Sequence, residues 1–336
     1  METSKRAGGS AASSLSVDKT ANAPALLEVS TGASGGYGGG ASYWYGYGAA
    51  TASSIARNAG EARAFASASG GSGGGSSYGG NGGQGGAASA TAQASSSTSA
   101  ASSGAYARGG QGGGVSNGDN SQAGAGGDAL ANAAATGAWS GYWWSNHVSS
   151  TASGGAGGSI YSGSGSGGAG GKARAMAAGV DTGGNGIYVS AQATGGLGGS
   201  SSNGSRGQSG AALATATGTA AAGQVSAQAR SPLDYYYDYR QVQANAYAPL
   251  ASSSTAEAGT NVSQALVPLS EAQGKQAAAY GTALPTRDSV EPLLLQNLAV
   301  QASFNPASTI LGYGVLGGGP PQARAAASII LPRSPM

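Results

Sequence analysis

Residues 170–179 read GGKARAMAAG and place Ala at every second position behind a pair of glycines. Near-copies of this stretch stand at 85–94 (GGAASATAQA), 126–135 (GGDALANAAA) and 209–218 (SGAALATATG). A period of two puts these Ala side chains on one face of a β-strand, whereas a helix gives no reason for such spacing. We therefore expect strands with one all-Ala face and one mixed face, with Ala175 on the first and Arg174 on the second.

The Ala-alternating stretches recur with one long period. They begin at Gly85, Gly126, Gly170 and Ser209, with spacings of 41, 44 and 39 residues. A second series of doubled glycines begins at Gly70, Gly109, Gly154 and Gly195, with spacings of 39, 45 and 41 residues. Each unit is thus an Ala-alternating arm, a variable tip, a second arm and a glycine-rich connector, and the array ends at Pro232.

This pattern predicts an all-β repeat fold, either a β-solenoid or stacked hairpins, with Gly-rich connectors and with partly disordered segments. Two Ala faces can approach more closely than ordinary packed sheets, which compensates for the small area that each Ala buries. Two alternatives stay open. The GGX rhythm of the connectors also fits a bundle of extended left-handed helices, and the whole composition also fits a largely disordered low-complexity chain.

The composition excludes several classes of protein. Of 336 residues, 65 are Gly and 8% are charged, with a formal net charge of +2 and no Cys. Disulfides and thiolate metal sites are therefore impossible, and the singly scattered basic residues predict no nucleic-acid partner. No apolar stretch has the length of a transmembrane helix. The first residues show no secretory signal peptide, so any export route is not evident there.

The composition also divides the chain into segments. After Pro232 large apolar residues return, and a short helix is expected between a Ser270 cap and a Gly281 stop, within a small mixed C-terminal segment. The expected segments are a disordered N-terminal segment (1–36), an aromatic Gly-rich segment (37–58), the Gly/Ala-rich array (59–231), a Tyr-rich linker (232–260), a small C-terminal segment (261–319) and a disordered tail (320–336).

The variable tips carry most of the aromatic residues of the array. In the widest tip, TGAWSGYWWSNHVSS (136–150), four aromatic side chains gather: Trp139, Tyr142, Trp143 and Trp144. Exposed aromatic clusters on a polar scaffold bind carbohydrate or partner surfaces. They can equally cap the sheet or stack on neighbouring units, which is the more common role of such residues.

The sequence predicts that the protein is not an enzyme. His147 is the only histidine and no cysteine is present, so the common pairs of nucleophile and base cannot be assembled elsewhere. The glycine clusters lack the Gly-Lys-Ser/Thr ending of a phosphate-binding loop, and the spaced aspartates of calcium-binding repeats are missing. No cofactor and no metal site is therefore expected.

Residues 276–319, QAAAYGTALPTRDSVEPLLLQNLAVQASFNPASTILGYGVLGGG, resemble a segment near the C-terminal end of Gly/Ala-rich repeat secreted bacterial proteins. Proteins of this kind often carry a PEP-CTERM sorting signal, although the signal itself is missing from this sequence. The resemblance implies an exported, non-enzymatic structural or adhesive protein of a bacterial cell surface or extracellular matrix. It would associate with itself or with surface polymers, and a module that binds carbohydrate or a partner through its aromatic tips is the alternative.

Overall fold

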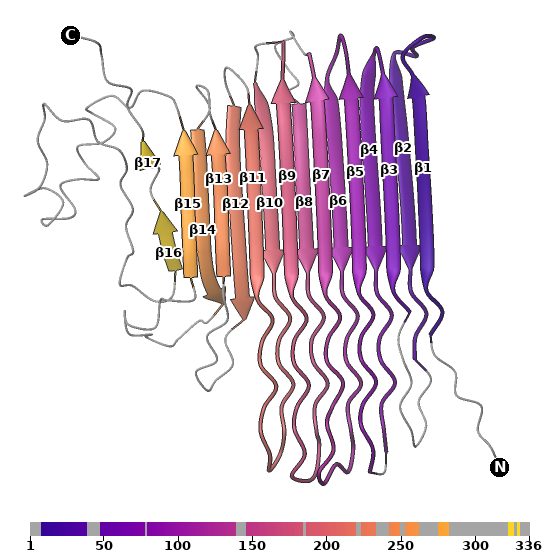
Figure 1. Cartoon of the computed structure of the whole chain (residues 1–336), viewed down its shortest axis with the longest axis vertical. Helices are drawn as coiled ribbons and strands as arrows, with labels where there is room; N and C mark the ends of the chain where they lie inside the picture. The colour runs from indigo at the N-terminus through magenta and orange to yellow at the C-terminus, as the bar shows by residue number, and fades with distance from the viewer. Residues whose placement is uncertain are drawn as a thin grey trace, which may run out of the picture.

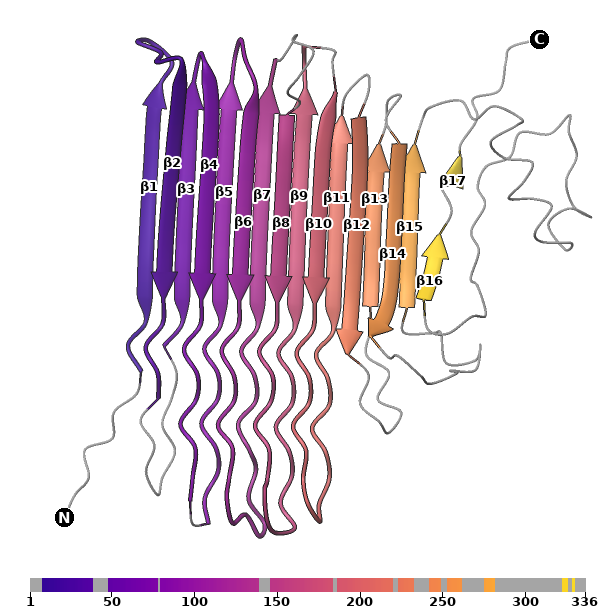
Figure 2. The same cartoon turned by 180° about the vertical axis from the view of Figure 1, so that it is seen from behind.

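The protein folds into two β-sheets of almost entirely parallel strands, which lie face to face (Figures 1 and 2). The computed structural model describes residues 8–38, 48–77, 79–138, 146–183 and 186–219, and after residue 219 only the backbone of strands β12 to β17. The first sheet holds the odd-numbered strands β1 Ala11–Lys19, β3 Ala50–Asn58, β5 Ala88–Ser96, β7 Ala129–Gly137, β9 Ala173–Asp181, β11 Ala212–Thr219, β13 Val242–Ala248, β15 Lys275–Gly281 and β17 Ser328–Ile329. The second holds the even-numbered strands β2 Leu26–Ser34, β4 Glu61–Ser69, β6 Ala101–Arg108, β8 Asn146–Ser153, β10 Ile187–Thr194, β12 Gly223–Pro232, β14 Ser253–Asn261 and β16 Gln322–Ala325.

Consecutive strands lie in opposite sheets, so each turn of the chain adds one strand to each sheet. Within a sheet, a strand pairs in parallel with the strand one turn earlier; β9, for example, pairs with β7 and β11. The exception is β16, which pairs antiparallel with β14. From β1 to β11 this arrangement is a β-solenoid of about 5 turns, and no helix occurs in the described part of the chain. The structure therefore confirms the all-β repeat and decides for the solenoid over stacked hairpins.

The core between the sheets consists almost entirely of Ala side chains. Along each arm, burial alternates with period two: Ala173, Ala175 and Ala177 of β9 are buried, whereas Arg174 points outward and is exposed. The registers align these positions across turns, so that Ala90, Ala131, Ala175 and Ala214 form one buried row. The predicted Ala face is thus confirmed as the core-facing side of the strands.

The glycine-rich connectors form a second body, the glycine bundle, which continues the slab beyond one end of the sheets (Figure 1). Its hydrogen bonds repeat every third residue, as expected for polyproline II helices, which have three residues per turn. In each GGX triplet the first glycine donates to the next turn of its own layer, as from Gly109 N–H to Ser153 O (2.9 Å). The second donates to the opposite layer, as from Gly110 N–H to Gly86 O (2.8 Å). The connectors thus share the three-residue repeat of the left-handed helices that were weighed as an alternative to the sheets.

Glycine is required in this bundle because the two layers touch through their backbones. One series of cross-layer bonds forms a continuous zigzag, in which each glycine donates to the one before it: Gly36, Gly48, Gly71, Gly86, Gly110, Gly127, Gly155, Gly171, Gly196 and Gly210. A Cβ added at Gly110 would lie 2.0 Å from the carbonyl oxygen of Gly71, and one added at Gly109 would lie 1.9 Å from that of Gly127. No side chain fits at such distances.

Buried polar side chains close the other end of the core, where the chain crosses between sheets. Asn58 donates to Pro24 O (2.9 Å) and Glu61 O (2.8 Å), and Ser96 donates to Gly60 O (2.7 Å). Asn146 accepts from Ala101 N–H (2.7 Å) and donates to Asp181 Oδ1 (2.8 Å). These side chains satisfy backbone groups at the tight tips that would otherwise be buried without partners.

The solenoid extends beyond the predicted array at both ends. The predicted disorder of 1–36 is wrong over β1 and β2, which pair with β3 and β4, and β3 lies within 37–58. The Tyr-rich linker 232–260 contains β13 and most of β14, and the tail 320–336 contains β16 and β17. Strand β15 replaces the helix expected before Gly281: its pairing with β13 offers a template that outweighs the helix propensity of Ala.

Candidate functional site

The four aromatic residues predicted as a binding surface, Trp139, Tyr142, Trp143 and Trp144, lie outside the described residues. The strand that follows them is described. His147 of β8 stands on the outer face of the even-strand sheet, and its ring stacks on Tyr188 of β10 with centroids 5.2 Å apart and planes 5° from parallel. Partial burial lowers the pKa of His147 below its ordinary value. The imidazole is therefore neutral at pH 7, as expected for a stacked ring.

Further aromatic side chains stand on this even-strand face. Phe65 of β4, Tyr106 of β6 and Tyr188 are all exposed there. Phe65 lies across Gly104 of the neighbouring strand, where a Cβ would come within 2.9 Å of its Cδ1. A shallow groove of about 330 Å³ runs beside the rings of Phe65 and Tyr106, and hydroxyl-bearing residues line it: Ser30, Ser67, Ser149 and Thr151.

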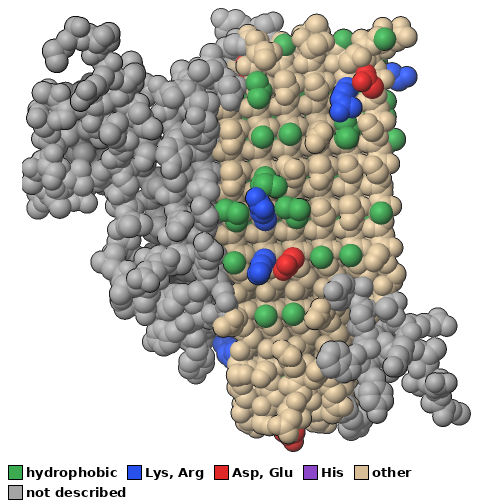
Figure 3. Space-filling view, viewed as in Figure 1, with side chains coloured by type: hydrophobic (Ala, Val, Ile, Leu, Met, Phe, Trp, Pro, Cys, Tyr) green, Lys and Arg blue, Asp and Glu red, His purple; other side chains and the backbone are tan. Residues whose placement is uncertain are grey.

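The opposite face, on the odd-strand sheet, carries a longer depression that we call the axial trough. Figure 3 shows this face as a flat lattice of mainly uncharged atoms with a few charged side chains. The trough has a volume of about 510 Å³ and crosses five neighbouring strands, from β3 to β11. It lies where the glycine bundle passes into the strands, and its floor consists of the first residue of each strand: Ala50, Ala88, Ala129, Ala173 and Ala212.

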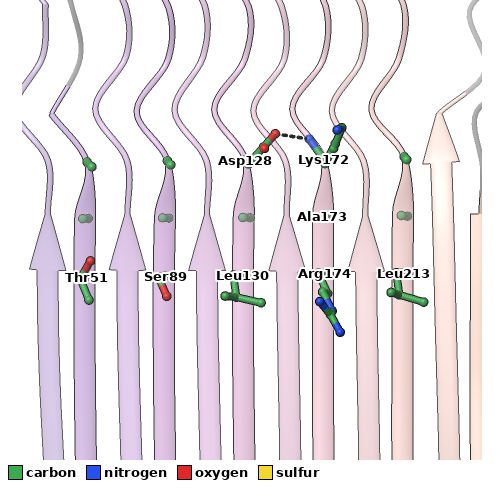
Figure 4. A pocket seen from close by; sticks show the side chains of 15 residues that line it. Thr51, Ser89, Asp128, Leu130, Lys172, Ala173, Arg174 and Leu213 are labelled. Carbon is green, nitrogen blue, oxygen red and sulfur yellow. Dashed lines mark hydrogen bonds between the residues drawn. The ribbon is translucent and has the colours of Figure 1, made fainter.

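Two rows of outward side chains form the walls of the axial trough (Figure 4). The row on the bundle side precedes the strands and comprises Ala49, Ala87, Asp128, Lys172 and Ala211. The row on the strand side lies two residues further along each strand and comprises Thr51, Ser89, Leu130, Arg174 and Leu213. The trough therefore follows the solenoid axis, at right angles to the strands.

The charges of the axial trough gather at β7 and β9. Asp128 Oδ1 accepts a hydrogen bond from the backbone N–H of Lys172 (2.7 Å), which fixes the carboxylate on the bundle-side wall (Figure 4). Lys172 and Arg174 flank Ala173 and stand on opposite walls. Within the described part of the chain neither cation has an ion-pair partner; the ion pair found there joins Arg63 to Glu61 (2.6 Å).

In the described ranges, no three His, Cys, Asp or Glu side chains gather where they could hold a metal ion. The same ranges contain no helix of the length and apolar character needed to cross a membrane. Sequence reasoning placed the candidate site at the loop tips and missed both faces. The sequence did contain a signal for the two faces: the residues that alternate with Ala in each arm point outward, as Phe65 does in EARAFASAS (61–69).

Comparisons with known proteins identify no relative: no family model, no curated protein and no solved structure matches the chain.

Proposed function

We propose that the protein is a non-enzymatic structural or adhesive repeat protein of a bacterial cell surface or extracellular matrix. One observation carries the proposal: the interior is built mainly of backbone, Ala and Gly, with a few Val and Ile side chains, so that most larger side chains stand on the two broad faces. Such a slab gains length by adding turns that contact only their neighbours. Its flat faces, rich in hydroxyl groups, suit contact with surface polymers or with further copies of the chain.

A deletion series tests this proposal in the organism that makes the protein. Removal of residues 85–125 joins Gln84 to Gly126 and takes out one complete turn, so the remaining turns can restack. We expect a shorter particle in small-angle scattering, an unchanged circular dichroism spectrum per residue and retention on the outside of intact cells. Removal of residues 85–100 takes out β5 alone and leaves Ala faces of the even-strand sheet uncovered, so we expect misfolding and loss from the surface.

Two outcomes would contradict the scaffold proposal. If the full-length protein stays inside the cells, the surface location is wrong. If removing the complete turn is as damaging as removing β5, the turns are not interchangeable, and a specific site within residues 85–125 must be sought instead.

A second candidate function is carbohydrate binding on the even-strand face. It is supported by the exposed rings of Phe65 and Tyr106 beside a hydroxyl-lined groove, because sugars bind through apolar ring faces together with hydrogen-bonding groups. A glycan array with the full chain tests it. The variant with Phe65→Ala and Tyr106→Ala should lose at least tenfold in apparent affinity. The control Leu197→Ala, an exposed apolar residue of the glycine bundle, should lose less than twofold; equal losses would refute this site.

A further inference from the structure

We propose that the axial trough binds a linear acidic polysaccharide, whose chain lies along the solenoid axis and one of whose carboxylates is held by Lys172 and Arg174 together. The inference rests on the proposed function at a surface or in a matrix and names the polymer class that this function would use. Its first support is shape: the trough is open at the surface, crosses five strands and has a floor of Ala without obstructing side chains.

The repeat of the trough matches a polysaccharide chain. Neighbouring strands of a sheet are about 4.8 Å apart, so five strands give a trough about 19 Å long. This strand spacing is close to the length of a single hexopyranose unit along an extended polysaccharide. Successive sugars can therefore meet equivalent positions on successive turns, with an Ala below each sugar and one residue of each wall beside it.

The wall residues have the chemistry of a sugar site. Thr51 and Ser89 offer hydroxyls to the polymer, and Leu130 and Leu213, on the strands either side of Arg174, offer apolar contact to C–H faces. Lys172 and Arg174 are separated by a single residue along β9, about 7 Å in an extended strand. A carboxylate seated above Ala173 is within reach of both side chains, and Arg can hold it with two parallel hydrogen bonds.

The structure disfavours two other occupants. An extended peptide binds a sheet by adding a strand to a free edge, but the floor of the trough crosses strands that are already paired on both sides. A nucleic acid needs a run of cations that follows its phosphates. Here two cations share the trough with the carboxylate of Asp128, which leaves a net charge near +1.

The experiment measures retardation of the full chain in native gels that contain polygalacturonate, with carboxyl-reduced polygalacturonate as the neutral comparison. We expect retardation in the acidic polymer that weakens as salt is raised. The double variant Lys172→Gln, Arg174→Gln should bind at least tenfold more weakly. The matched control Arg57→Gln, Arg108→Gln removes the same charge outside the trough, from exposed positions on the two faces, and should bind within twofold of the unaltered chain.

Each other outcome overturns the proposal. Absence of retardation in polygalacturonate refutes the ligand class, and equal weakening by the two double variants shows attraction by net charge alone. Equal retardation by poly-glutamate shows recognition of any acidic chain and refutes the sugar assignment. A circular dichroism spectrum matching that of the unaltered chain establishes that each variant is folded. Surface location is measured separately on intact cells, so a failure here leaves the scaffold proposal standing.

Discussion

The two β-sheets with their Ala core, which we call the Ala sandwich, and the glycine bundle belong to the same turns of one chain. They nevertheless tolerate side chains very differently. In the sandwich, two sheets face each other across Ala methyl groups; in the bundle, two layers meet through direct N–H to carbonyl hydrogen bonds. The sandwich gains apolar burial, whereas the bundle gains hydrogen bonds worth about 1 kcal/mol each and bears the entropy cost of ordered glycine. The separation of the layers therefore decides which residue each region accepts.

The Ala sandwich also accepts some core residues that are larger than Ala. Ile187 and Val189 of β10 are fully buried within it, and the facing position of β9 is Gly179. A Cβ at Gly179 would lie 2.3 Å from Ile187 Cδ1 and 2.8 Å from Val189 Cγ2. Larger residues in one sheet are thus matched by a smaller residue in the other, and the total volume of the layer is kept. The hydrogen-bonded glycines of the bundle, such as Gly110 and Gly71, allow no such exchange, because the atoms in contact are backbone atoms on both sides.

The largest expected effect comes from placing a methyl group inside the bundle. Gly110→Ala puts a Cβ 2.0 Å from Gly71 O, and no side-chain rotation can relieve this contact. We expect a loss above about 4 kcal/mol, or a chain that does not fold, measured by denaturant unfolding. In the control Gly75→Ala the nearest atom, Gly114 O, is 3.2 Å away, and the loss should stay near or below about 1 kcal/mol. Similar losses for the two variants would show that the layers can separate.

A charge on the core face of the sandwich is expected to have the next largest effect. Ala175→Glu buries a carboxylate without a partner and should cost about 3–5 kcal/mol, because Ala175 is completely buried. Arg174→Glu changes the exposed face of the same strand and should stay within about 0.5 kcal/mol. Thermal unfolding of both variants measures the difference, and equal shifts would contradict the assignment of the two faces.

A smaller effect tests the volume match between the sheets. Gly179→Ala should cost about 1–3 kcal/mol through overpacking, and Ile187→Val alone about 0.5–1.5 kcal/mol. Because Ile187→Val removes the Cδ1 atom in closest conflict, the double variant should be more stable than the sum predicts by at least about 0.5 kcal/mol. If the two losses of unfolding free energy simply add in the double variant, the proposed volume match between the sheets is wrong. Gly32→Ala, where a Cβ meets no atom within 4 Å, controls for the intrinsic effect of the substitution.

The smallest expected effect is a dependence of stability on pH through His147. Partial burial lowers the pKa of this ring in the folded chain, so below about pH 6.5 the unfolded chain binds the proton more readily. Stability should be full at neutral pH and should fall as acid passes the unfolded pKa and then the folded one. His147→Phe keeps a ring to stack on Tyr188 and should remove this part of the slope. Denaturant unfolding between pH 5 and 7 measures this dependence. If the free energy of unfolding of the variant changes with pH as much as that of the unaltered chain, His147 is not its source.

Much of the fold could be predicted because the two layers use strict local periods. Alternating Ala predicts a strand and its buried face, as at Ala175, and the two landmark series predict the length of a turn. The same reasoning predicted an array that is too short at both its N-terminal and its C-terminal end. In β1 (AASSLSVDK) and β15 (KQAAAYG) the pattern is short or mixed, and these segments become strands because a neighbouring sheet offers paired backbone.

The candidate site was less predictable than the fold. The sequence directed attention to Trp139, Tyr142, Trp143 and Trp144, which lie outside the described residues, whereas the axial trough and the groove beside Phe65 join residues from several turns. Lys172 and Asp128 are 44 residues apart in sequence, and the register between β7 and β9 makes them neighbours. No local pattern contains that information, since it depends on how many residues each tip and connector holds.

The sequence by itself determined the two periods of this protein: Ala at every second residue where sheets meet, and a three-residue repeat of glycine, often paired, where backbones meet. Both periods arise from local steric requirements, because the size of the side chain at each position indicates how much space the fold leaves there. Only the tertiary structure decided that both layers share the same turns, that Asn58, Ser96, Asn146 and Asp181 close the core, and which outward residues form the axial trough. The physical reason is register: parallel pairing aligns residues about one turn apart, and the aligned side chains create surfaces that no single arm possesses.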